Sequence, residues 1–192
     1  MSERTLGAIL TGGRSTRMGE DKADVVVNGR PMLDGVARAM RVVCDRVVLL
    51  GPDRPGWETW PDSVHASGPL AGVATALGRA VADRVLLVAV DHPFVRSETL
   101  ERLTAIVSDL PVVPVDDEGA RQVTCAVYPT AIAAEAADEA GAGGSIQTLL
   151  DRVSFVPVTP DQWMSWGEDG RSWFSVDSVE RRDEALTRFG SG

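Results

Sequence analysis

The chain is poor in positive charge and in long apolar runs, and both shortages narrow what it can bind. Its 19 lysines and arginines oppose 28 aspartates and glutamates, which gives a net charge of −9 over 192 residues. We therefore expect no general attraction to nucleic acid or to an anionic membrane, and any anionic ligand must meet locally concentrated cations. No apolar run approaches the roughly 20 residues that are needed to cross a bilayer.

Cysteine and histidine are also scarce. The two cysteines, Cys44 and Cys125, form no Cys-x-x-Cys motif and follow no visible secretory signal. We therefore expect both to be reduced and buried in a cytoplasmic protein. The two histidines, His65 and His92, belong to no recognisable Ser/His/Asp arrangement, so chemistry based on an activated serine is not expected.

Short apolar runs alternate with longer segments at helical spacing, which is typical of βα units around a mainly parallel sheet. The predicted strands are residues 6–10, 46–50, 84–90, 112–115, 123–128 and 155–158. The predicted helices are residues 32–43, 70–81, 98–107, 131–140 and 179–189. Because residues 85–90 are continuously apolar, their strand should be central and covered on both faces. The pattern predicts a three-layer, Rossmann-like α/β fold.

Three local signals refine these boundaries. Ser97 should cap the helix that starts at Glu98, and Asp177 with Ser178 should cap the last helix. The dipeptide Asn28-Gly29 predicts a tight hairpin turn, because both residue types tolerate positive φ.

A glycine-rich loop, Leu10 to Lys22, follows the first predicted strand directly. Its glycines carry no Cβ, so backbone N–H groups can turn inward, and Arg17 and Lys22 can neutralise a polyphosphate held there. In open α/β sheets, ligands bind beyond the carboxyl ends of strands, which is where this loop begins. We therefore predict a nucleoside triphosphate site, with a merely flexible surface loop as the alternative.

The spacing of this loop excludes two better-known phosphate loops. A P-loop has four residues between its first glycine and Gly-Lys-Ser/Thr, whereas five residues separate Gly13 from Gly19, and Lys22 comes three after Gly19. A dinucleotide loop reads Gly-x-Gly-x-x-Gly, whereas this one begins Gly12-Gly13-Arg14. The loop therefore belongs to neither class.

Asp91 ends the most buried predicted strand, at the sheet edge where the glycine-rich loop should also emerge, and Pro93 stops the strand from continuing. A carboxylate there can hold Mg²⁺ against a triphosphate, since Mg²⁺ takes few protein oxygens and completes its octahedron with phosphate and water. The alternative is an aspartate that only caps a turn.

The string LTGGRSTRMGEDKA resembles the signature of the pyrophosphorylase-like nucleotidyltransferases. Within that superfamily, its Gly-Gly and Gly-x-Asp-Lys elements are most similar to the molybdenum cofactor guanylyltransferases. The resemblance continues through residues 28–33, 68–72, 91–94 and 174–180, and so spans almost the whole chain.

This resemblance implies an enzyme that transfers GMP from GTP to the terminal phosphate of molybdenum-bearing molybdopterin and releases pyrophosphate, with Mg²⁺ as cofactor. It assigns catalytic roles to Arg17, Lys22 and Asp91, and metal binding to Asp91, with Asp177 as a second metal candidate or a helix cap. The nucleotide contacts that it implies are Leu10, Thr11, Gly12, Gly13, Ser15, Lys22, Asp62, Gly68 and Gly72. It also implies transient contact with proteins that handle or accept the molybdenum cofactor.

The base preference depends on fewer residues than the triphosphate site. Guanine presents two adjacent donors that one carboxylate can accept together, and Asp62 matches that role, although Pro-Asp-Ser is also an ordinary turn. Three positions depart from the family pattern. These are Thr11 in place of Ala, Gly51 near a usual Asn, and Ser175-Val176-Asp177 in place of Asn-x-Asn.

With 44 % hydrophobic residues in 192, the chain can bury one core, so we expect a single domain. Residues 1–95 would form its nucleotide-binding half, 96–189 its acceptor-binding half and 190–192 a flexible tail. In the second half, Arg121 and Gln122 are candidates to face the acceptor. A tryptophan cluster there, Trp163, Trp166 and Trp173, could stack on a pterin, but packing beneath a loop is the favoured reading.

Two other functions stay open at this point. One is a related nucleotidyltransferase that uses CTP or a different phosphorylated acceptor. The other is a non-catalytic GTP-binding protein that hands over the cofactor. The presence of Arg17, Lys22 and Asp91 together favours an enzyme.

Overall fold

A seven-stranded sheet forms the centre of the computed structural model, which describes residues 4–11, 21–61 and 68–190. The strand order is β5-β4-β1-β6-β8-β7-β9. The strands are β1 (Thr5–Leu10), β4 (Val47–Leu50), β5 (Thr59–Trp60), β6 (Arg84–Ala89), β7 (Val112–Pro114), β8 (Cys125–Pro129) and β9 (Val156–Val158). Within this sheet, β8 pairs antiparallel with both neighbours and the other pairings are parallel. The predicted mainly parallel α/β sheet is confirmed.

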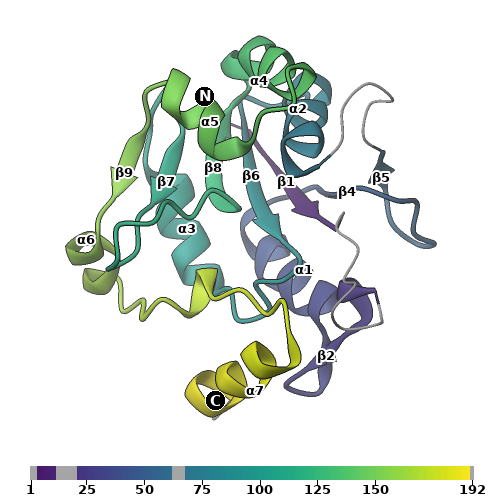
Figure 1. The fold of residues 1–192 in the computed structure, drawn as a ribbon, viewed down its shortest axis with the longest axis vertical. Coiled ribbons are helices and arrows are strands. Elements are labelled where there is room, and N and C mark those ends of the chain that lie inside the picture. The colour runs from purple at the N-terminus through teal and green to yellow at the C-terminus, as the bar shows by residue number, and fades with distance from the viewer. Residues whose placement is uncertain (1–3, 12–20, 62–67, 191–192) are drawn as a thin grey trace.

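Helices cover both faces of the sheet and give the molecule three layers (Figure 1). One face packs against α1 (Met32–Val43), α3 (Ser97–Ala105), α6 (Pro160–Ser165) and α7 (Val179–Phe189). The other face packs against α2 (Pro69–Arg79), α4 (Ala133–Gly141) and α5 (Ile146–Arg152). In the part of the chain that the structure describes, no helix combines the length and apolarity needed to cross a membrane.

The central strand β6 shows why an unbroken apolar run fits this fold. Leu86 and Val88 enter the core on the α1 side, whereas Val85 and Leu87 enter the core on the α2 side. All four are at most 1 % exposed. Since alternate residues of a strand point to opposite faces, burial on both faces requires apolar residues throughout. The predicted central position of this strand is confirmed.

The path of the chain creates a crevice at one edge of the sheet. From β1 the chain passes through α1 to β4 on one side, and it later returns through α2 to β6 on the other side of β1. Such a reversal of direction is the point at which open α/β sheets bind ligands, beyond the carboxyl ends of the strands. The backbone N–H of Val90 donates to Leu10 at 2.9 Å, which keeps the ends of β1 and β6 together.

Most of the predicted elements are present, but three short ones were missed. These are β5, α5 and α6. The predicted hairpin is confirmed, because Asn28 and Gly29 join β2 (Val26–Val27) to β3 (Arg30–Pro31) with φ values of 49° and 72°. Both cysteines are free and buried, as expected.

The two predicted helix caps have different outcomes. The prediction for Ser97 is wrong: Arg96 occupies the N-cap of α3 and makes no capping bond with its side chain, and Ser97 is the first helical residue. At α7 the prediction is confirmed for Ser178, whose hydroxyl oxygen accepts a hydrogen bond from the N–H of Arg181. The carboxylate of Asp177 is therefore not the group that caps this helix.

Candidate active site

An ion pair between Lys22 and Asp91 lies at the carboxyl edge of the central strands. The Nζ atom of Lys22 is 2.9 Å from Oδ2 of Asp91, and the two side chains are 19 % and 20 % exposed. The two residues are 69 positions apart in the chain, in segments that follow β1 and β6. The fold thus brings together two of the three predicted catalytic residues. The third, Arg17, lies outside the described residues.

The pair borders a cavity of about 340 Å³. One wall comes from the first half of the chain: Leu10, Thr11, Lys22, Pro69 and residues 89–92. The opposite wall comes from the second half: Gln122, Thr124, Trp173 and Ser175. A volume of this size falls in the range of small-molecule sites. Both halves of the chain therefore contribute to the lining of this cavity.

A larger groove of about 930 Å³ lies at the other edge of the sheet. Its lining includes Thr5 and Arg84, the first residues of β1 and β6, together with exposed Val42 and Val81. It is thus at the amino ends of the strands, whereas ligand sites of open α/β sheets lie at the carboxyl ends. We assign the chemistry to the smaller cavity for this reason and because it contains the ion pair.

A short 3₁₀ turn, Lys22–Asp24, fixes the backbone from which the Lys22 side chain projects. Oδ1 of Asp21 accepts from the N–H of Ala23 at 3.0 Å, and the Asp21 carbonyl accepts from the N–H of Asp24 at 2.9 Å. Ala23 itself is completely buried. The turn is therefore anchored on both sides of Lys22, which leaves the ammonium free to reach across the edge.

The loop after β6 holds Asp91 by contacts to two other segments. The carbonyl of Asp91 accepts from the N–H of Val176 at 2.8 Å, which brings the segment before α7 beside it. On the other side, α1 approaches so closely that a Cβ added at Gly35 would lie 3.2 Å from the carbonyl oxygen of Pro93. A side chain at position 35 would therefore crowd the backbone of this loop at Pro93.

Asp91 keeps its charge although it is largely covered. Burial acts to raise the pKa of its carboxyl group, but His92, the ammonium of Lys22 and a hydrogen bond with Ser175 outweigh burial and bring that pKa below 3.8. The residue is therefore ionised at neutral pH. A permanently charged, partly accessible carboxylate is what a magnesium ion requires of a protein ligand.

His92 is buried and connects the two halves of the site. Its Nε2 atom lies 2.9 Å from the hydroxyl of Thr124 and 3.9 Å from Oδ1 of Asp91. Burial lowers the pKa of the ring below 6.5, against the opposing effect of the Asp91 carboxylate. Its position suits the ring to holding the Asp91 loop against the segment before β8.

The remaining predicted nucleotide contacts have mixed positions. Leu10 and Thr11 line the cavity, but the hydroxyl of Thr11 donates to the Leu50 carbonyl at 3.0 Å and so ties β1 to β4. Gly68 has φ of 95° and caps α2, and Gly72 is buried inside that helix. Four predicted contacts lie outside the described residues: Gly12, Gly13, Ser15 and Asp62.

On the acceptor side, the structure separates the two polar candidates. Gln122 lines the cavity, whereas the guanidinium of Arg121 pairs with Asp151 at 2.8 Å and lies outside the cavity wall. Trp163 and Trp173 pack edge to face with ring centroids 5.3 Å apart, and both are 6 % exposed. Packing therefore accounts for both rings, and Trp173 also reaches the cavity.

Two features of the site were missed in the sequence. The first is that Lys22 is the only lysine in the sequence. The other 18 of its 19 lysine and arginine residues are all arginine. A single exception of this kind is a visible signal that the position needs a compact ammonium rather than a planar guanidinium. The second feature is Arg54, which contacts the turn that carries Lys22. No local pattern marks it.

The fold and the site together define a class of protein: a doubly wound α/β protein with its candidate ligand site at the carboxyl edge of the sheet. The chain belongs to the family described as the MobA-like NTP transferase domain, whose model matches residues 7–155. It is therefore a nucleotidyltransferase by family, and the resemblance found in the sequence is confirmed.

Several relatives bear a more specific name. A probable molybdenum cofactor guanylyltransferase of Natronomonas pharaonis is 34 % identical over 203 residues, which cover 98 % of this chain and 99 % of that protein. One of the same name from Deinococcus radiodurans is 44 % identical over 95 residues, 47 % of this chain and 49 % of that protein. In this match and several others, the chain spans about half the length of the curated relative.

A solved structure supports the fold over nearly the whole chain. It is the molybdopterin-guanine dinucleotide biosynthesis protein A of Archaeoglobus fulgidus, with a TM-score of 0.82 and 22 % identity. The superposition covers 95 % of this chain and 97 % of that one. At this identity the likeness concerns the fold, and the chemistry must be argued from the site.

Proposed function

We propose that the protein transfers GMP from GTP to the terminal phosphate of molybdenum-bearing molybdopterin, with release of pyrophosphate and formation of molybdopterin guanine dinucleotide. The observation that carries the proposal is the Lys22–Asp91 pair at the carboxyl edge of β1 and β6. It sets a cation for phosphate oxygens beside a carboxylate for a metal ion. Relatives that match over the whole chain or over about half of it carry the name molybdenum cofactor guanylyltransferase, which supports the choice of guanine and of the molybdenum cofactor.

Mg²⁺ fits the donors that this edge offers. Asp91 supplies an ionised carboxylate, and the described part of the chain contains no group of three or more His, Cys, Asp or Glu that could hold a metal. Mg²⁺ is commonly bound by one or two carboxylates together with substrate phosphates, whereas zinc sites use three or four protein ligands. Asp91 would hold the ion, with Asp177 as a second candidate. When bound, the ion would neutralise charge on the triphosphate.

The protein's own groups would act by alignment and by charge. Lys22 would exchange its contact with Asp91 for the phosphate oxygens of GTP, with Arg17 as support. The terminal phosphate of the acceptor is already anionic near pH 7, so it can attack the α-phosphorus without a protein base. The new bond joins that phosphate to GMP, the bond to the β-phosphate breaks, and pyrophosphate leaves.

The second half of the chain would receive the acceptor. The lining of the cavity that the Lys22–Asp91 pair borders includes four residues of this half: Gln122, Thr124, Trp173 and Ser175. They carry an amide, two hydroxyls and an indole ring, which are groups that can bind a polar, planar molecule. An acceptor would compete with Asp116 for the amide nitrogen of Gln122 and with His92 for the hydroxyl of Thr124. In this account, proteins that handle or receive the molybdenum cofactor would make transient contact near this wall.

The test is to incubate the protein with Mg²⁺, molybdenum-bearing molybdopterin and each nucleoside triphosphate in turn, and to identify the nucleotide in the product. The proposal expects pyrophosphate and a guanine dinucleotide with GTP alone. Turnover with CTP and not with GTP would identify a cytidylyltransferase, and equal turnover with both would contradict the guanine preference. Binding of GTP without turnover would instead identify a protein that hands the cofactor over.

A further inference from the structure

Arg54 reaches back from the segment after β4 to both carboxylates that flank Lys22. One guanidinium nitrogen, Nη1, lies 2.7 Å from Oδ1 of Asp24. The other, Nη2, lies 2.7 Å from Oδ2 of Asp21 and 3.2 Å from Oδ2 of Asp24. Arg54 is 30 residues after Asp24 and 33 residues after Asp21 in the chain. The three hydrogen bonds therefore tie the turn that carries Lys22 to the segment that follows β4.

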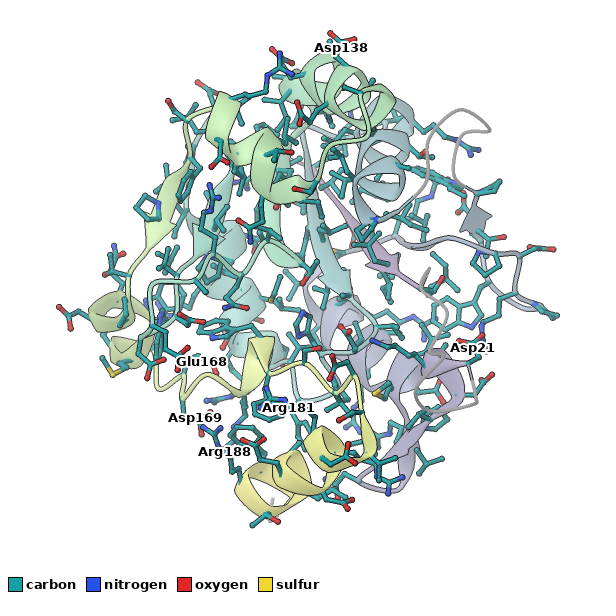
Figure 2. All side chains as sticks on the ribbon, in the orientation of Figure 1. Asp21, Asp138, Glu168, Asp169, Arg181 and Arg188 are labelled. Carbon is teal, nitrogen blue, oxygen red and sulfur yellow. The ribbon has the colours of Figure 1, made fainter. Side chains whose placement is uncertain are left out.

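The guanidinium of Arg54 is more enclosed than the two carboxylates that it contacts. The side chain of Arg54 is 23 % exposed, although its partners Asp21 and Asp24 are 49 % and 62 % exposed. Its own carbonyl accepts from the N–H of Trp57 at 3.2 Å, which closes a turn around it. One planar guanidinium can bind two carboxylates at once. It therefore loses less side-chain entropy per hydrogen bond than two lysines that each paired with one carboxylate would lose. Figure 2 shows Asp21 on the side of the molecule that carries β2, far from Glu168 and Arg181.

The two carboxylates are close neighbours of Lys22 in the chain, although they do not line the cavity that the Lys22 ammonium borders. Asp21 precedes Lys22 directly and Asp24 follows it by two positions. Left unpaired, both would oppose the attraction of the Lys22 ammonium for a triphosphate, and salt would only partly screen this repulsion at close range. The chain as a whole is already strongly acidic. A binding site for a polyanion therefore needs these two charges cancelled.

We propose that Arg54 is a positioning residue for the triphosphate site, which fixes the turn that bears Lys22 and cancels the charges of Asp21 and Asp24. This inference rests on the proposed function, because it takes Mg-GTP as the ligand. It adds a residue from the end of β4 to a site otherwise built from the ends of β1 and β6.

The first test measures the affinity for Mg-GTP of the full chain carrying Arg54→Met, which keeps an unbranched stem and removes the guanidinium with its charge. We expect the dissociation constant and KM for GTP to rise about tenfold, with a smaller change in kcat. The matched control is Arg46→Met. It breaks a comparable two-bond pair with Glu58, at 2.5 and 3.1 Å, at the opposite end of β4. The control should bind GTP as the wild type does.

A triple variant separates the charge effect from a loss of shape. If Arg54 cancels repulsion, then Asp21→Asn and Asp24→Asn added to Arg54→Met should restore at least half of the lost affinity. The loss in Arg54→Met should also shrink at high salt. Affinity that stays low in the triple variant would overturn the electrostatic role. Thermal unfolding of every variant establishes that each is folded.

The outcomes also distinguish this inference from the function on which it rests. If the wild type binds none of the four nucleoside triphosphates, the proposed function fails and the inference fails with it. If the wild type binds Mg-GTP and Arg54→Met binds it equally well, the inference alone is overturned.

Discussion

The ammonium of Lys22 and the carboxylate of Asp91 meet at 2.9 Å, across the point where the chain leaves β1 and β6. Each residue balances the charge of the other in the structure, and each has a different task in the proposed reaction. Lys22 would bind phosphate oxygens, whereas Asp91 would hold the metal ion. The two roles can therefore be separated by changing one residue at a time.

Replacing Asp91 by Asn should reduce turnover much more than nucleotide affinity. Asn keeps the size of the side chain but loses the charge that a magnesium ligand needs, so pyrophosphate release should fall by about 100-fold or more. Asp151→Asn is the control, since Asp151 also pairs with one cation, Arg121, but lies on α5 outside the cavity. Turnover within twofold of the wild type in Asp91→Asn would rule out the metal assignment.

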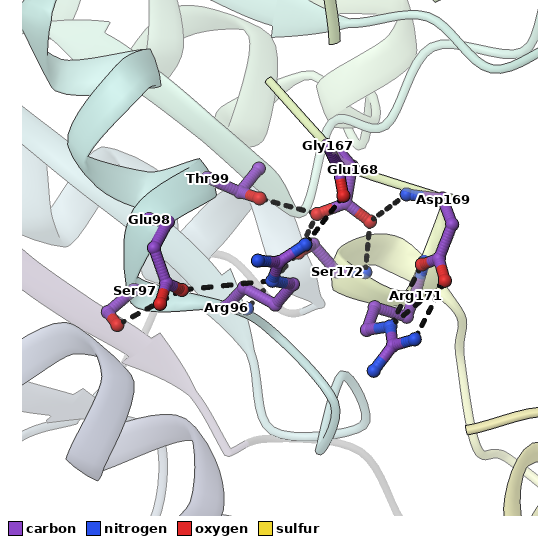
Figure 3. A network of polar contacts seen from close by, with 9 residues as sticks. All are labelled: Arg96, Ser97, Glu98, Thr99, Gly167, Glu168, Asp169, Arg171 and Ser172. Carbon is purple, nitrogen blue, oxygen red and sulfur yellow. Dashed lines mark hydrogen bonds and ion pairs between the residues drawn. The ribbon is translucent and has the colours of Figure 1, made fainter. Parts of the chain in front are cut away.

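A buried carboxylate should make a large contribution to stability. Glu168 is 3 % exposed and joins the start of α3 to the turn before Trp173 (Figure 3). Oε2 accepts hydrogen bonds from the hydroxyls of Thr99 and Ser172, and Oε1 accepts from the N–H groups of Asp169 and Ser172 at 3.1 and 3.2 Å. Removing this acceptor leaves four donors without their partner.

We therefore expect Glu168→Ala to lower the free energy of unfolding by about 3 kcal/mol, because buried polar groups that lose a partner carry a full desolvation cost. Urea denaturation measures it. Glu98→Ala in the same network is the control, since Glu98 is 66 % exposed and should change stability little. Equal midpoints for Glu168→Ala and the wild type would contradict the importance of the network.

The pairing of α4 with α5 should give the protein an acid-dependent stability. The pKa of Glu139 is held below 4.5 by a hydrogen bond from Thr148 and by Arg152, whose Nη1 lies 2.6 Å away. Because the folded pKa is the lower one, the unfolded chain takes up the proton first as the pH falls. This contribution is fully present above about pH 4.5 and is lost as the pH falls through the folded pKa.

Glu139→Gln should thus flatten the decline in the free energy of unfolding between about pH 6 and about pH 3.5. Glu135→Gln on the exposed face of the same helix is the control and should decline as the wild type does. A Glu139→Gln profile parallel to that of the wild type would show that this pair does not couple protons to folding.

The sequence predicted the strands well where burial on both faces requires a continuous run of apolar residues. The run at residues 85–90 could only be central, and β6 is central. The direction of β8 was not predictable, because a buried strand carries the same apolar run in either orientation. α6 was missed despite a readable signal, since Thr159 and Gln162 form a capping box with Pro160 at the first helical position.

The site was predictable in its parts but not in its contacts. A loop after a strand and a carboxylate after another strand indicate one sheet edge, and Lys22 and Asp91 do meet there. Contacts that cross the fold leave no local pattern. Arg54 therefore could not be connected with Asp21 and Asp24 before the path from β4 was known, and the pairing of Arg121 with Asp151 was likewise hidden.

The most direct measurement of the central claim uses the fact that Lys22 is the only lysine. Reductive methylation with ¹³C formaldehyde labels its Nζ, keeps the positive charge and gives one lysine resonance, with the α-amino group as an internal control. Titration with Mg-GTP should move the Lys22 resonance in a saturable way and leave the α-amino resonance in place. A Lys22 resonance that stays unmoved while Mg-GTP saturates the protein would contradict the account.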